Sequence, residues 1–160
     1  MSRAGRLLSR LSRSFQALAA IGLMGITLLL LARPLVRHFG IQFHGIEALS
    51  QLLAVWIAFL MLGTVEIHER HIRIEYFYDK LPSRVQSQVD LMIGGVYLLV
   101  TLVAAISAVF AIQVLQGATL QPLGIPAAIV PVGPLIGFSF LTLVLLAKFA
   151  GVDFDVISRD

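Results

Sequence analysis

Residues 91–115 read LMIGGVYLLVTLVAAISAVFAIQVL, a run without any charged side chain. Its polar positions are confined to Thr101, Ser107 and Gln113. A helix needs about 20 mainly apolar residues to cross the hydrocarbon core of a bilayer, which is about 30 Å thick. This run therefore predicts a transmembrane helix.

Three other stretches have the same character. A closed β-barrel would require short segments of alternating polarity, whereas these runs are continuously apolar. The whole chain is 58% hydrophobic and 13% charged, against about 25% charged residues in soluble domains. This composition excludes a soluble enzyme, a nucleic-acid-binding module and a disordered chain. We expect an all-α membrane protein in which residues 1–160 form a single membrane domain, with spans at about 15–32, 49–65, 91–115 and 129–149.

The distribution of basic residues predicts the orientation of the spans. Ten of the twelve Lys and Arg residues precede the first span, lie between the second and third spans, or lie at or beyond the C-terminal end of the fourth. The other two, Arg33 and Arg37, follow the first span. Because Lys and Arg accumulate in cytoplasmic loops, both termini are expected in the cytoplasm.

Residues 1–14 combine basic and apolar positions. Leu7, Leu8, Leu11 and Phe15 fall on one helical face, with four arginines around the other. This pattern predicts an amphipathic helix lying on the anionic inner leaflet, and a basic tail that only sets topology is the alternative. The apolar run that follows is longer than the 7–15 residues of a typical signal peptide, so we expect an uncleaved first span. The arginines are Arg3, Arg6, Arg10 and Arg13.

The centres of the four predicted spans contain no Asp, Glu, Lys, Arg or His. Ionisable groups at that depth usually mark proton relays or substrate sites, so a self-sufficient transporter is disfavoured. Backbone carbonyls at broken helices can still bind Na⁺ without charges, and a self-assembling carrier or channel therefore stays a further alternative. The chain has no Cys and no recognisable nucleophile or phosphate-binding motif, so we expect no catalytic residue.

The four histidines raise the question of a bound haem or metal. Axial haem ligands in membrane anchors lie within facing helices, whereas these histidines fall in the predicted loops. We therefore expect no cofactor and no metal. A membrane anchor of a haem or quinone redox complex is the alternative function that this count of helices and histidines suggests. The residues are His38, His44, His68 and His71.

Small residues four positions apart recur in three of the spans. This spacing lets helices approach closely, and it serves internal packing as readily as contact with a partner. Prolines punctuate the start of the fourth span, where they predict a bent segment with a short helix or re-entrant piece. That segment is interpreted either as a kinked span end or as an apolar docking surface at the periplasmic face. The small pairs are Gly133 with Gly137, Ala54 with Ala58, and Ala104 with Ala108; the prolines include Pro126, Pro131 and Pro134.

A further set of residues follows a particular order along the four spans: Glu47, Leu49, Leu53 and Trp56, the segment Arg70 to Glu75, Leu81 and Pro82, and Ile125, Pro126, Pro131, Gly133, Gly137 and Phe138. In this order the chain resembles the small membrane subunit of TRAP transporters, the tripartite ATP-independent periplasmic carriers. The resemblance covers about residues 15–150, and it departs from the family pattern at Ala48, Glu66 and Glu69.

The resemblance implies a subunit of a heteromeric Na⁺-driven importer of organic acids in the bacterial inner membrane. A large membrane permease subunit would carry the ion and substrate sites, and a periplasmic solute-binding protein would deliver the solute. The small subunit would be non-catalytic, would scaffold the large one within the lipid bilayer, and would help to dock the binding protein. The predicted partner-contact residues are Trp56, Arg70, Arg73, Glu75, Pro126, Pro131, Gly133 and Gly137.

Overall fold

The computed structural model of the chain describes residues 3–39, 45–68 and 83–152. Each of its four long helices contains a stretch long and apolar enough to cross a membrane, which confirms the all-α membrane fold with four spans. The helices are α1 (Arg3–His38), α2 (Gly45–His68), α4 (Ser83–Val114) and α5 (Val132–Phe149). Between α4 and α5 lie β1 (Thr119–Leu120), β2 (Ile125–Pro126) and the 3₁₀ helix η1 (Ala127–Ile129).

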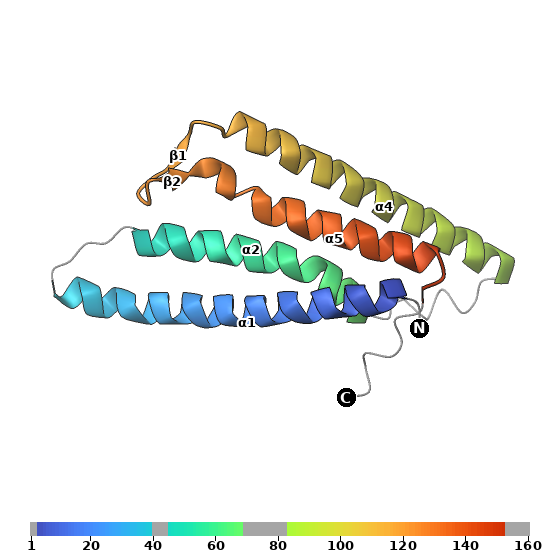
Figure 1. Cartoon of the computed structure of the whole chain (residues 1–160), viewed down its shortest axis with the longest axis horizontal. Helices are drawn as coiled ribbons and strands as arrows, with labels where there is room; N and C mark the ends of the chain where they lie inside the picture. The colour runs from blue at the N-terminus through green and yellow to red at the C-terminus, as the bar shows by residue number, and fades with distance from the viewer. Residues whose placement is uncertain (1–2, 40–44, 69–82, 153–160) are drawn as a thin grey trace.

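The helices form an open row in the order α1, α2, α5 and α4 (Figure 1). Helices α2 and α5 run in one direction, and α1 and α4 run in the other. The strands β1 and β2 lie at one end of the row, which we call the hairpin end. At the opposite end, which we call the terminal end, α1 begins and α5 finishes. In the apolar stretch that includes the inner helix α5, 44% of the residues are buried, whereas in that of the edge helix α1 only 6% are. The edge helices therefore leave most of their surface to lipid or to partners.

Helix α1 is longer than the span predicted from the sequence. Its 36 residues extend about 54 Å, well beyond the thickness of the hydrocarbon core. The segment before residue 15 is helical, as expected, but it continues into the span as one uninterrupted helix. Its position relative to a membrane surface stays a prediction.

The apolar face predicted for this N-terminal segment divides in two. Leu8 and Phe15 pack against the core cluster of Ile67, Phe140 and Val144, and the Phe15 and Phe140 rings meet edge to face with centroids 5.0 Å apart. Leu7 and Leu11 remain exposed. One half of the predicted apolar face is therefore part of the protein core.

Helices α2 and α5 cross at closely spaced glycines. A Cβ atom at Gly133 would lie 3.2 Å from the Cα of Trp56, and one at Gly137 would overlap the backbone carbonyl of Phe59. On the other helix, a Cβ at Gly63 would enter the ring of Phe140. The two backbones approach so closely because these positions have no side chain.

Helix α4 packs on the other side of α5, again through small or short side chains. A Cβ at Gly94 would meet the ring of Phe149, and Ala108 is buried. Between these positions the hydroxyl of Thr142 donates to that of Thr101 over 3.3 Å. Hydrogen bonds between such hydroxyls add modestly to helix association in a membrane, so shape carries most of this contact.

We predict that Gly137→Ala destabilises the folded chain, because the new methyl group has to displace the backbone of α2. The expected loss is about 1–3 kcal/mol in the free energy of unfolding, measured by denaturation of the full chain in detergent. Gly95→Ala is the matched control on α4, where an added Cβ meets nothing within 4 Å. Equal stability of the two variants would contradict the close crossing.

Candidate partner interface

The connection between α4 and α5 forms a short hairpin that ends in η1. Thr119 pairs with Pro126, and the backbone N–H of Ala127 donates to the carbonyl of Ala118 over 2.9 Å. Gly117 and Gly124 have φ values of +83° and +68°, which side-chain-bearing residues rarely adopt. The short helix predicted before the fourth span is confirmed as η1.

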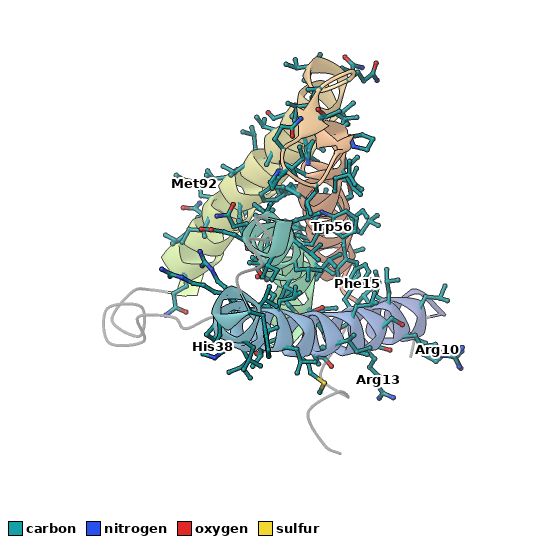
Figure 2. The ribbon with its side chains drawn as sticks, turned by 90° about the vertical axis from the view of Figure 1, so that its left-hand side faces the viewer. Arg10, Arg13, Phe15, His38, Trp56 and Met92 are labelled. Carbon is teal, nitrogen blue, oxygen red and sulfur yellow. The ribbon has the colours of Figure 1, made fainter. Side chains whose placement is uncertain are left out.

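Trp56 links this hairpin end to α2. Its indole N–H donates to the carbonyl of Ile129 at the end of η1 over 3.1 Å, and its ring lies against Gly133. Figure 2 shows the side chain between α2 and α5. This partner-contact candidate is therefore engaged within its own chain.

The other candidates at this end divide by exposure. Gly133, Gly137 and Pro131 are buried, and Pro131 caps the start of α5. Pro126 is exposed on β2. The structure thus assigns the two glycines to internal packing, and their contact with a partner stays a prediction. The structure brings Trp56, Pro131, Gly133 and Gly137 together around the start of α5.

The charged partner-contact candidates follow α2 in the sequence. Arg70, Arg73 and Glu75 lie outside the described residues.

Of the histidines, His38 ends α1 at the hairpin end, and His68 ends α2 at the terminal end. They are thus at opposite ends of the row, and His44 and His71 are outside the described residues. Residues 3–39, 45–68 and 83–152 contain no group of three metal-binding side chains.

Helix α2 carries a carboxylate at each end, and each is paired with a cation of a neighbouring helix. At the hairpin end Arg33 of α1 binds Glu47 over 3.1 Å, with both side chains 58% exposed. At the terminal end Lys148 of α5 donates to the Glu66 carboxylate over 2.5 Å and to the Glu66 backbone carbonyl over 2.7 Å. The Glu66 side chain is only 10% exposed. These pairs link α2 to both of its neighbours.

Glu47 and Glu66 flank the span predicted at residues 49–65, but the sequence did not identify the cations that pair with them. Glu66 and Lys148 each lie at the C-terminal end of a predicted span. Their shared level in the membrane was the feature of the sequence that pointed to this pair. The sequence alone did not show that α2 and α5 are neighbours running in the same direction. Without that knowledge, several basic residues at the same membrane level were equally good candidates for the cation that pairs with Glu66.

One face of α2 remains uncovered and carries small side chains. Gln51, Ala54 and Ala58 are all exposed and follow one another at helical spacing. The other small pairs differ: Gly133 and Gly137 are buried against α2, and the α4 pair includes Ala108, which is buried. The Ala54 and Ala58 pair is therefore the one whose two members both face outward.

Comparison with known families gives a match that covers most of the chain. The sequence model of the DctQ component of the tripartite ATP-independent periplasmic transporters matches residues 26–153. That range includes the last third of α1, both inner helices, α4 and the hairpin. A search of curated proteins finds no match to this chain.

We predict that Lys148→Met destabilises the chain strongly, because it leaves the nearly buried Glu66 carboxylate without its cation. The expected loss is about 3 kcal/mol in the free energy of unfolding, measured in detergent at neutral pH. Arg33→Met is the matched control, because it breaks an exposed pair and should cost at most about 1 kcal/mol. A larger effect of Arg33→Met would refute this ranking of the two pairs.

Proposed function

Because the chain belongs to the DctQ family, the small membrane component of tripartite ATP-independent periplasmic transporters, we propose that it scaffolds the large permease subunit without transporting solute itself. The transporter would import organic acids with Na⁺, and the large subunit would carry the ion and solute sites. We further propose that this chain helps to dock the periplasmic solute-binding protein. The family match carries the proposal, and the features below support it.

The hydroxyl groups of the membrane-spanning helices support a role without a solute site of its own. The hydroxyls of Thr27, Ser50 and Ser107 each donate to a carbonyl one turn earlier in the same helix. Thr142 donates to Phe138 and to Thr101. These polar groups are thus used for packing within the chain. The Lys148 and Glu66 pair is held at the end of the row and neutralises itself.

The uncovered small-residue face of α2 supports a docked helix of the large subunit. Ala54 and Ala58 would let another backbone approach closely, and the amide of Gln51 offers a hydrogen bond at the same face. In a lipid environment close packing and interhelical hydrogen bonds drive association, because lipid tails are as apolar as leucine. We therefore place the main contact with the large subunit on this face.

The hairpin end supports docking of the solute-binding protein. The distribution of Lys and Arg favours cytoplasmic termini, and with that orientation the hairpin would lie on the periplasmic side. Gln121, Pro122 and Pro126 are exposed there, and the hydrogen bonds around β1, β2 and η1 hold the backbone in a fixed shape. A fixed, exposed surface suits recognition by a second protein, because little conformational freedom is lost on binding.

We predict that the large subunit loses solute uptake when this chain is left out of proteoliposomes that also receive the solute-binding protein. Ala58→Trp should give the same defect by preventing assembly, since the indole would hold the helices apart. The measurements are co-purification of the two subunits and Na⁺-dependent uptake. Ala20→Trp, also an exposed alanine but on α1, is the control and should retain both.

Two outcomes would separate the parts of this proposal. Uptake that is unchanged without the chain would remove the scaffold function altogether. Uptake that persists with Ala58→Trp but is lost without the chain would leave the scaffold function in place. It would show that the contact with the large subunit lies away from this face of α2.

We predict that Pro126→Glu weakens docking of the solute-binding protein while leaving the membrane subunits assembled. The substitution adds charge at an exposed position, where the cost to folding is expected to be within about 0.5 kcal/mol. Binding of the solute-binding protein to the reconstituted complex is the measurement. Gln116→Glu, exposed just before the hairpin, is the control. Undiminished binding by Pro126→Glu would place docking elsewhere.

A further inference from the structure

The N-terminal third of α1 carries a row of arginines that its family role does not use. Arg6, Arg10 and Arg13 are exposed and follow one another at spacings of four and three residues. Such spacing places them on one face of the helix. Figure 2 shows Arg13 directed away from the other helices, whereas Phe15 points toward them.

Packing on the opposite face fixes the direction of this row. Ser12 and Ala19 are buried, and Leu8 and Phe15 contact the core of the chain. Rotation of α1 about its axis would break these contacts. The arginines are therefore held outward by the fold, even though their own side chains are exposed.

A third face of the same segment is apolar and exposed. Leu7 is 66% exposed and Leu18 is 55% exposed, with Leu11 between them. Farther along α1 the surface of the span is apolar and exposed as well, at Leu28 and Leu35 among others. Exposed leucines beside arginines are typical of a segment at the boundary between acyl chains and headgroups.

The position of the row along the helix agrees with that boundary. Arg13 and Arg33 are separated by about 30 Å along α1, which equals the thickness of the hydrocarbon core. Arg10 and Arg6 follow about 4.5 and 10.5 Å beyond Arg13. Each headgroup layer is about 5–7 Å thick, and a tilt of the helix brings the whole row closer to it.

The acids that the structure describes do not neutralise this row. Glu47 is paired with Arg33, and Glu66 is paired with Lys148. Among the described residues no carboxylate lies within ion-pair distance of Arg6, Arg10 or Arg13. Three neighbouring positive charges beside an apolar face are complementary to a surface of negative charge that adjoins hydrocarbon.

We propose that Arg6, Arg10 and Arg13 form a binding site for the phosphate headgroups of anionic lipids in the leaflet where α1 begins. The guanidinium groups bind the phosphates, and Leu7 and Leu11 contact the upper acyl chains. This site goes beyond the scaffold function, since it would set the depth and tilt of α1 whether or not a partner is bound.

The proposal is tested on the full chain purified in detergent and titrated with phosphatidylglycerol or with phosphatidylcholine. Native mass spectrometry counts the lipids that stay bound. The chain is expected to prefer phosphatidylglycerol. Arg6→Gln, Arg10→Gln and Arg13→Gln combined should lower this preference at least about tenfold, since each basic residue near a membrane surface strengthens the attraction severalfold. High salt should also lower the preference.

Two controls guard against a trivial loss. The corresponding triple lysine variant keeps the charge and should keep most of the preference. Arg37→Gln, which removes an exposed arginine at the far end of α1, should leave it nearly unchanged. Wild-type preference in the triple glutamine variant, or an equal loss in the triple lysine variant, would overturn the proposal.

The remaining outcome to test is that the row of arginines binds a protein partner and not lipid. The triple glutamine variant is therefore also co-purified with the large subunit in nanodiscs that contain phosphatidylglycerol. Intact assembly supports lipid as the occupant. Dissociation of the large subunit would show that the arginines bind an acidic protein surface, and this would overturn the lipid site.

Discussion

The close crossing of α2 and α5 is the contact on which the rest of the fold depends. It requires bare backbone at Gly63, Gly133 and Gly137, because aromatic rings and a backbone carbonyl fill the space that a side chain would need. The two outer helices are arranged around this pair: α1 packs mainly on α2, with Phe15 also reaching Phe140 of α5, and α4 packs on α5. In a membrane the hydrophobic effect does not drive helices together, so shape complementarity of this kind has to supply the association.

The spans could be predicted from the sequence, whereas their neighbours could not. Long uncharged runs are enough to identify membrane helices, because the bilayer sets both their length and their composition. An apolar helix has no polar face to mark its outside, and small residues at four-residue spacing occur on internal and external faces alike. The sequence therefore could not separate Gly137, which is buried against Phe59, from Ala58, which is exposed. The three-dimensional arrangement was needed to distinguish them.

The N-terminal segment shows a related limit. Counting apolar and basic residues predicts a helix with two faces, but the structure has three, because Leu8 and Phe15 join the core while Leu7 and Leu11 remain outside. A helical-wheel argument assigns all of the leucines to one environment, since it contains no information about the neighbouring helices. The same argument missed the Lys148 and Glu66 pair, whose partners are far apart in the sequence but close at the terminal end of the row.

An open row of helices has consequences for the small component of a multi-subunit transporter. A closed bundle would bury its small residues and present only lipid-facing side chains, whereas this row leaves α1 and α4 exposed along most of their length and leaves part of α2 uncovered. The inner pair is rigid because two backbones are locked together through glycines, the Trp56 hydrogen bond and the Lys148 ion pair. A closely packed centre with exposed edges keeps its shape and offers a broad apolar surface. These are the physical properties that a static scaffold beside a moving transport subunit requires, and they need no ionisable group at the middle of the membrane.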